Sequence, residues 1–180
     1  MENKRPKIFV GVLIMTKVKF SENSPEELVA VLQRRGKIDA ETSSGFKIQS
    51  FPGLCEITSY GKAKEGENWQ TAMDREMTEE LGMEVAEMIL KTERKIIYQI
   101  IEDDNDKVVI ASCILPASFL GKLKLEVCTG GIEIIRKDDI KRIKYFDFGS
   151  NKNLSSTHLD EIIMTTLPIK KLEEAFEIYK

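Results

Sequence analysis

The chain has 180 residues and a formal net charge of −3, with 42% hydrophobic and 32% charged residues. This length and balance predict one globular domain covering residues 1–180. No apolar run approaches the roughly 18 residues that a transmembrane helix needs, so we expect no membrane span. The mild acidity, without a dense basic patch, argues against dedicated nucleic-acid binding.

Few residues suited to disulfides or soft metals are present. There are three cysteines, Cys55, Cys113 and Cys128, and one histidine, His158. The odd number and the lack of a CxxC pair argue against a disulfide framework or a zinc site. We expect reduced, mostly buried thiols in a cytoplasmic protein. One histidine cannot build a multi-histidine metal site, so we assign His158 no chemical role.

The first third of the chain is predicted to be strand-rich. β-Branched and alternating apolar residues predict strands over 8–20, 28–36, 46–51 and 54–61, with a loop over 37–45. The basic start and short apolar run at the N-terminus weakly mimic a signal peptide. No small-residue cleavage site follows them, however, so we interpret them as leading into the first strand.

A helix is predicted over residues 68–81. Asn68 can cap its N-terminus, and Gly82 stands where a helix C-terminus favours glycine. An apolar stripe recurs every four residues and consists of Trp69, Met73, Met77 and Leu81. We expect this stripe to dock on a sheet, with Trp69 as a packing contact rather than a platform for a nucleobase.

The remaining elements complete an α+β order. Residues 83–104 and 107–115 are interpreted as two strand-rich runs joined by a hairpin at Asp104-Asn105-Asp106. Further strand is predicted over 123–135, a short turn or helix over 137–143, and a helical tail over 155–180 that is interrupted near Pro168. Mixed strands with one internal and one C-terminal helix favour α+β over a βαβ series.

Five glutamates crowd into sixteen positions around the predicted helix: Glu65, Glu67, Glu76, Glu79 and Glu80. Like charges three or four residues apart on a helix repel each other by a few tenths of a kcal/mol per pair. At 100° per residue, the last three share an arc of roughly 100° beside the apolar stripe. Clustered oxygen ligands suit a hard cation, Mg²⁺ or Mn²⁺, which would offset the repulsion. Arg75, one turn before Glu79, could hold a carboxylate in place.

Residues 61–83 closely resemble the Nudix box, G-x5-E-x7-R-E-U-x-E-E-x-G-U, where U is a bulky apolar residue. All nine specified positions match: Gly61, Glu67, Arg75, Glu76, Met77, Glu79, Glu80, Gly82 and Met83. With average residue usage, a chance match at one position is on the order of one in 10⁸. The resemblance implies a Nudix fold, a mixed β-sheet sandwich with the box helix and a C-terminal helix.

The resemblance also implies an activity, the Mg²⁺- or Mn²⁺-dependent hydrolysis of a nucleoside diphosphate derivative to monophosphate products. The implied metal ligands are Glu76, Glu79, Glu80 and the carbonyl of Gly61. Catalysis is assigned to Glu76, Glu79 and Arg75, while Glu67 and Arg75 form an orienting pair. Met77 and Met83 are implied to be packing residues. The general base is either a box glutamate or a carboxylate from a distant loop, for which Glu126 and Glu133, flanking CTGG, are the candidates.

Several alternatives stay open on the sequence alone. One is a non-catalytic Nudix-fold module that binds a nucleotide or regulates a partner, although such modules typically lose box carboxylates. An isoprenoid diphosphate isomerase is disfavoured, because that branch binds metal largely through histidines. Arg34 and Arg35 could meet phosphate groups, but a solvated strand end is the expected role. Tyr60 could stack on a nucleobase or cover the cleft. The substrate is open, and a homodimer is suggested only by the resemblance.

Overall fold

The computed structural model of the chain describes residues 7–36, 38–39, 47–48, 52–102, 105–126, 129–145 and 162–180. The strands are β1 Phe9–Val18, β2 Glu27–Arg35, β3 Ile38–Asp39, β4 Lys47–Ile48, β5 Cys55–Ile57, β6 Ser59–Lys62, β7 Lys95–Glu102, β8 Asn105–Pro116, β9 Thr129–Arg136, β10 Ile143–Tyr145 and β11 Ile162–Met164. The helices are α1 Trp69–Leu81, α2 Met83–Leu90 and α3 Ile169–Ile178, with short 3₁₀ helices at Ala117–Lys122 and Lys137–Arg142. Within these ranges, no helix is long and apolar enough to span a bilayer.

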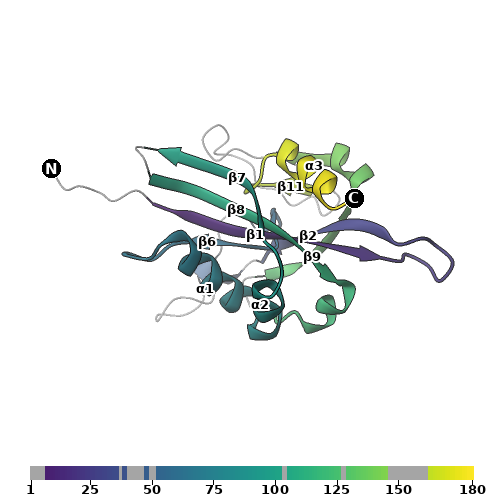
Figure 1. Ribbon diagram of the computed structural model, residues 1–180, viewed down its shortest axis with the longest axis horizontal. Helices are drawn as coiled ribbons and strands as arrows, with labels where there is room; N and C mark the ends of the chain where they lie inside the picture. Colours follow the sequence, from purple (N-terminus) through teal and green to yellow (C-terminus); the bar gives the residue numbers. More distant parts are fainter. Residues whose placement is uncertain are drawn as a thin grey trace.

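A mixed, nine-stranded sheet organises the described part of the chain (Figure 1). Its main strand order is β10-β11-β5-β2-β1-β8-β7, with β6 paired to β1 and β9 paired to β2. The β1–β8 pair is parallel, whereas β1 runs antiparallel to both β2 and β6. The predicted hairpin is confirmed, because β7 and β8 pair in antiparallel fashion. Strand β3 pairs only with β4, in a separate two-stranded sheet.

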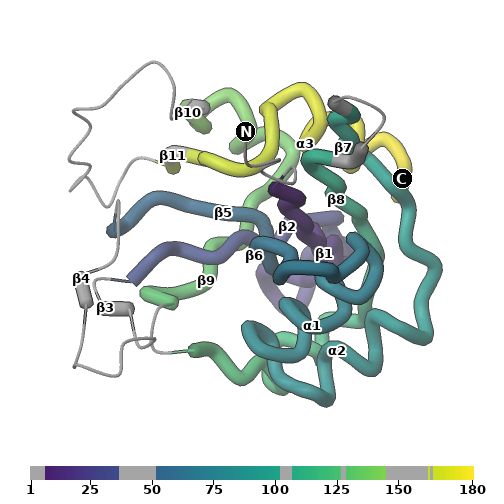
Figure 2. Tube along the Cα trace, turned by 90° about the vertical axis from the view of Figure 1, so that its left-hand side faces the viewer, coloured from purple at the N-terminus to yellow at the C-terminus, as the bar shows by residue number. Residues whose placement is uncertain are grey.

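The central strand β1 is covered on both faces, which explains its nearly continuous apolar sequence. Val10, Val12 and Ile14 belong to the core beneath α1 and α2, whereas Leu13 and Met15 belong to the core beneath α3. Both views show α3 on one face of the sheet and α1 with α2 on the other (Figures 1 and 2). The predicted α+β fold is therefore confirmed, with helices on both faces of a mixed sheet.

Helix α1 begins and ends where its sequence predicts. The Asn68 side chain accepts a hydrogen bond from the Thr71 amide, and the Gly82 amide bonds to the Thr78 carbonyl. Gly82 adopts φ +83°, which a residue with a side chain rarely adopts. The apolar stripe packs on the sheet as expected, with its last three members buried and Trp69 half-buried against the same core. Met83 was expected to pack but is 69% exposed, because it begins the next helix on its outer side.

The strand prediction for residues 83–104 is wrong over its first part. Residues 83–90 form α2, and strand begins only at Lys95. The buried residues Val85, Ala86 and Ile89 have helical rather than alternating spacing, so one face of a helix packs against the core.

Residues 54–61 were predicted as one strand but form two, because the chain crosses here from β2 to β1. Strand β5 pairs with β2, and β6 pairs with β1. Thr58, at the crossing, accepts a hydrogen bond from the Ile14 amide (2.7 Å) and donates one to the Val31 carbonyl (2.5 Å). The side chain thereby joins the two long strands where the ladder is interrupted.

The C-terminal predictions hold in part. Helix α3 begins directly after Pro168, but residues 162–164 form strand β11, parallel to β10 and β5, instead of helix. Residues 123–126 are not strand either, because the Lys124 amide bonds to the Leu81 carbonyl at the end of α1 (3.1 Å). Cys128, His158, most of 46–51 and most of the predicted loop over 37–45 lie outside the described residues, but residues 38–39 of that loop form strand β3 because they pair with β4.

The two cysteines within the described ranges are free and buried, as expected. They are Cys55 in β5 and Cys113 in β8. Burial raises the pKa of each thiol to about 12. Both therefore stay protonated at neutral pH and act as small apolar side chains.

We predict that Met77→Ala lowers the free energy of unfolding by about 2–5 kcal/mol, because it leaves a cavity between α1 and the sheet. Met77 has no exposed surface. Urea unfolding measures the loss, and Gln70→Ala, on the exposed side of the same helix, is the matched control. That control should change stability by no more than about 0.5 kcal/mol. Equal losses in both variants would contradict the packing of the stripe.

Candidate functional site

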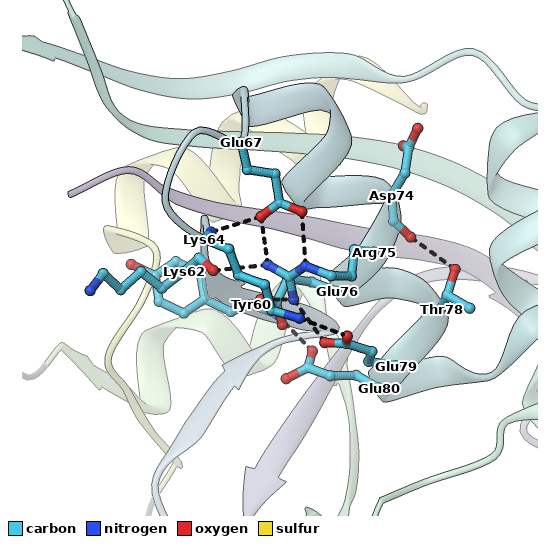
Figure 3. Close-up of polar contacts among 10 residues, drawn as sticks. All are labelled: Tyr60, Lys62, Lys64, Glu67, Asp74, Arg75, Glu76, Thr78, Glu79 and Glu80. Atoms are coloured by element: carbon cyan, nitrogen blue, oxygen red, sulfur yellow. Dashed lines mark hydrogen bonds and ion pairs between the residues drawn. The ribbon is translucent and has the colours of Figure 1, made fainter. Parts of the chain in front are cut away.

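The guanidinium of Arg75 lies among the carboxylates of Glu67, Glu76 and Glu79 (Figure 3). Its Nε and Nη2 donate to Glu67 at 3.0 and 2.9 Å, and its Nη1 donates to Glu76 at 2.7 Å and Glu79 at 2.8 Å. Nη2 also donates to the carbonyl of Lys62 at 3.0 Å. One cation from α1 thus joins the loop after β6 to two carboxylates of its own helix. These bonds raise the pKa of Arg75, so it stays charged.

Glu67 closes the loop between β6 and α1. Its carboxylate receives both guanidinium bonds from Arg75 and a third bond from the backbone amide of Lys64 (2.7 Å). The Arg75 bonds, followed by the Lys64 amide, lower the pKa of Glu67 to about 2. Glu67 therefore remains ionised at any ordinary pH. The paired geometry of Glu67 and Arg75 fixes the position of this loop relative to the helix.

Glu76 lies directly against the backbone of Gly61 in β6. A Cβ placed on Gly61 would overlap the Glu76 carboxylate, so any side chain at position 61 would displace it. Burial raises the pKa of Glu76, and the hydrogen bond from Arg75 opposes this effect. The glycine therefore lets a carboxylate of the helix and a backbone segment of the sheet approach each other closely.

Glu80 turns away from Arg75 and accepts a hydrogen bond from the Tyr60 amide at 2.9 Å (Figure 3). Burial raises the pKa of Glu80 to about 8. Hydrogen bonding to the Tyr60 amide and the Ser59 hydroxyl opposes this rise, whereas the negative charges of Glu56 and Glu76 add to it. Although the Ser59 hydroxyl influences the pKa of Glu80, its Oγ is buried and forms no hydrogen bond with the described residues. A buried carboxyl group that lacks a cation thus retains its proton near neutrality.

Glu79 is the most solvent-accessible of the three helical carboxylates in the box. Its side chain is 43% exposed, and besides Arg75 it has only the long contact to Lys64 Nζ at 3.4 Å. Because one of its partners is an exposed lysine, Glu79 is the carboxylate that can most easily change partner.

The donor set suits a hard cation, although its present arrangement does not form a cage. Glu76, Glu79 and Glu80 lie on one side of α1, and the Gly61 backbone lies against Glu76. Over the described part of the chain, no three acidic, histidine or cysteine side chains converge as a metal centre. Arg75 holds two of the carboxylates, and the Tyr60 amide holds the third. The chemistry of the oxygens fits Mg²⁺ or Mn²⁺, and binding would require carboxylates to exchange partners.

The sheet contributes a second charged pair that the sequence did not reveal. Arg35 Nη1 donates to Glu56 at 2.5 Å, and both side chains are mostly buried. Arg34, in turn, pairs with Glu133 (2.9 Å from Nε) and with the Gly53 carbonyl (2.7 Å). The expectation of a solvated strand end is therefore wrong for both arginines. Glu56 could have been found from alternation, since it separates two buried residues of β5.

The two general-base candidates lie in different places. Glu133 is opposite Leu32 in the β2–β9 pair, and Leu32 belongs to the core beneath α3, so Glu133 lies on the sheet face away from α1. The structure does not bring it to the carboxylates of the box. Glu126 is exposed and follows Lys124, whose backbone contacts the end of α1. Of the two, Glu126 is therefore the candidate whose neighbouring backbone reaches α1.

Other features lie away from the box carboxylates. The Tyr60 ring stacks on Phe9 with centroids 6.0 Å apart, and Tyr60 packs against the core beneath α3. A cleft of about 450 Å³ is bounded by the β1–β2 hairpin and the end of α3. Four basic and four acidic side chains line it, and none of its lining residues lies within 61–83. Such a balance of charge does not favour an anion over a cation.

Comparisons with known proteins identify structures with a similar fold but no matching sequence family. No protein-family model matches the chain, and no curated protein matches it. Among solved structures, a mutT/nudix family protein from Listeria innocua aligns with a TM-score of 0.55 and 18% identity, covering 97% of this chain and 96% of that one. The NUDIX domain of Shewanella oneidensis NrtR, solved with ADP ribose, aligns with a TM-score of 0.51 and 13% identity, covering 98% and 90%. The chain therefore has the Nudix fold.

We predict that Arg75→Ala lowers the free energy of unfolding by about 1–3 kcal/mol, because partly buried carboxylates lose their shared donor. The matched control is Arg94→Ala, which removes a single, more exposed ion pair with Asp74. That variant should lose no more than about 1 kcal/mol. Urea unfolding of both variants tests the difference. A loss in Arg94→Ala as large as in Arg75→Ala would show that the network adds no stability beyond a surface pair.

Proposed function

We propose that the protein hydrolyses a diphosphate bond in a nucleoside diphosphate derivative, in a reaction that requires Mg²⁺ or Mn²⁺ and releases monophosphate products. The observation that carries the proposal is the meeting of the box residues within a Nudix fold. Three helical carboxylates lie beside a glycine whose bare Cα admits one of them, and an arginine braces two of them. A purely structural helix has no need of this combination.

Glu76, Glu79, Glu80 and the Gly61 carbonyl would hold the metal. A divalent ion bound there would neutralise phosphate oxygens and lower the pKa of a water molecule positioned for in-line attack. Among the described residues, the three carboxylates of Glu67, Glu76 and Glu79 share the single guanidinium of Arg75, so a further positive charge would be favourable there.

The residues of the chain have separable roles in this proposal. Glu67 holds Arg75 through two bonds, so the guanidinium stays in place when Glu76 and Glu79 turn toward a ligand. Glu80 would lose its proton when a positive charge replaces the apolar surroundings that now favour the neutral form. The proton of the attacking water would pass either to a box glutamate, of which Glu79 is the most exposed, or to Glu126.

The alternative is a Nudix-fold module that binds a nucleotide derivative without consuming it. It has the same fold and retains the metal site but lacks a base in reach of the water. The NrtR domain solved with ADP ribose has a similar fold, so binding of such a compound is a shared expectation of both proposals. A homodimer stays a prediction from the resemblance alone.

Glu79→Gln should reduce turnover at least about a thousandfold while leaving the fold intact, because the variant loses a charged ligand and a proton acceptor. The assay separates products by chromatography after incubation with nucleoside diphosphate derivatives and nucleoside triphosphates, with Mg²⁺ or with chelator. Glu87→Gln, an exposed glutamate of α2, is the matched control and should retain full activity. Metal-dependent binding of one compound without turnover by the wild type would favour the binding module.

Gly61→Ala should weaken Mn²⁺ binding by about 10- to 100-fold, since the new Cβ would displace the Glu76 carboxylate. Gly121→Ala is the matched control, because a Cβ there meets no atom within 4 Å. Electron paramagnetic resonance of free Mn²⁺ reports binding without any assay of turnover. Wild-type affinity in Gly61→Ala would remove the Gly61–Glu76 contact from the proposed metal site.

A further inference from the structure

Arg35 and Glu56 form the sheet side of the site. Val31, Gln33 and Arg35 alternate along β2, and Val31 belongs to the core beneath α1 and α2. Glu56 is directly opposite Gln33 in the β2–β5 pair, so it points to the same face. Its neighbours Cys55 and Ile57 belong to the core beneath α3, which likewise places Glu56 on the opposite face, beneath α1. The pair therefore lies across from the carboxylates of the box.

The backbone at Arg35 is built irregularly. The β2–β9 register shifts between Arg34, opposite Gly131, and Arg35, opposite Thr129, so Gly130 is the extra residue. A Cβ on Gly130 would lie 3.0 Å from the Arg35 carbonyl oxygen, which leaves room for little but glycine. Bulges of this kind re-aim a side chain and are frequent beside functional sites. Here the bulge lies in β9 beside Arg35, whereas Arg34 and Arg35 face the α3 side and the α1 side because successive residues of β2 alternate.

Arg35 has donors that none of the described residues engages. A guanidinium carries five N–H donors, and among the described residues the Arg35 side chain donates one hydrogen bond, from Nη1 to Glu56. Its Nε is buried and has no hydrogen-bond partner among the described residues. A buried donor without an acceptor is unfavourable. The side chain as a whole nevertheless keeps 19% of its surface exposed, so part of it is accessible to a ligand.

The other cations of the site are less suited to an incoming anion. All three nitrogens of the Arg75 guanidinium already donate to carboxylates or to a carbonyl. The Lys64 side chain is 66% exposed, and among the described residues its one ion pair is the long contact to Glu79. Arg35 is thus the one described cation of the site that is both held in place and under-used. A fork of N–H groups matches phosphate oxygens in geometry as well as in charge.

We propose that Arg35, oriented by Glu56, binds phosphate oxygens of the substrate diphosphate on the sheet side of the site, opposite the metal-binding carboxylates. The inference rests on the proposed function and names the residue that recognises the diphosphate in it. Arg35 is a binding residue and Glu56 is its positioning residue. The diphosphate then lies between a positive group from β2 and the acidic face of α1.

The test uses methylenediphosphonate, a non-hydrolysable diphosphate, titrated into the full chain with Mg²⁺ by calorimetry. Arg35→Gln should weaken its binding at least about tenfold. Arg35→Lys should recover only part of that loss, because it keeps the charge but not the fork. Mn²⁺ binding without the diphosphonate should not weaken in either variant, since the metal ligands lie on α1 and β6. Arg34→Gln, which removes the neighbouring pair on the opposite face, is the matched control and should stay within about twofold of wild type.

Removing Arg35 leaves Glu56 mostly buried without a partner, so stability is controlled separately. The double variant Arg35→Gln with Glu56→Gln removes both charges, and it should show the same loss of diphosphonate binding with a wild-type thermal transition. Wild-type affinity in this variant, or in a folded Arg35→Gln, would overturn the role of Arg35 and leave the proposed function standing. A wild-type protein without metal-dependent diphosphonate binding would overturn both proposals.

Discussion

The site depends on one guanidinium placed among like charges. Arg75 donates to Glu67, Glu76 and Glu79, and without it these carboxylates would repel each other across a loop and a helix. The repulsion that the sequence makes conspicuous is therefore offset within the chain itself. Because Glu67 holds Arg75 from the loop side, two of the helical carboxylates can change partner while the cation stays where it is.

Close approach between backbone and side chain is the second constraint. Gly61 lets Glu76 lie against β6, and Gly130 lets β9 bulge against Arg35. Gly61 thereby brings a carboxylate of α1 against the sheet, and Gly130 lies against the backbone of Arg35 and Gly36. The helix supplies the acidic side of the site, and β2 with β5 supplies the side that carries Arg35 and Glu56. In the proposed function a diphosphate would use both sides, because the oxygens that bind the metal and the remaining oxygens would all be neutralised.

The sequence-based predictions were wrong where a short segment could form either a helix or a strand, and there the tertiary contacts determined the secondary structure. The run at 83–90 is apolar enough for a strand, but its buried residues follow one helix face. Residues 162–164 become a strand because they pair between β10 and β5, which no local pattern reveals. Met83 satisfies the box pattern as a bulky apolar residue yet is exposed at the start of α2. A short apolar run is compatible with either a helix or a strand, and its packing and pairing partners in the tertiary structure determine which one forms.

The sequence by itself determined the helix of the box, its caps, its buried stripe and the carboxylates on its adjacent face. These features depend on residues three or four positions apart, so local spacing is sufficient. It also determined the strands β1 and β2 and the β7–β8 hairpin. Only the tertiary structure decided that Gly61 meets Glu76, that Glu133 lies on the sheet face away from α1, and that Arg35 pairs with Glu56 on the α1 face. Those relations join residues distant in the chain, and strand pairing, crossing and bulges set them without any signal at the positions themselves.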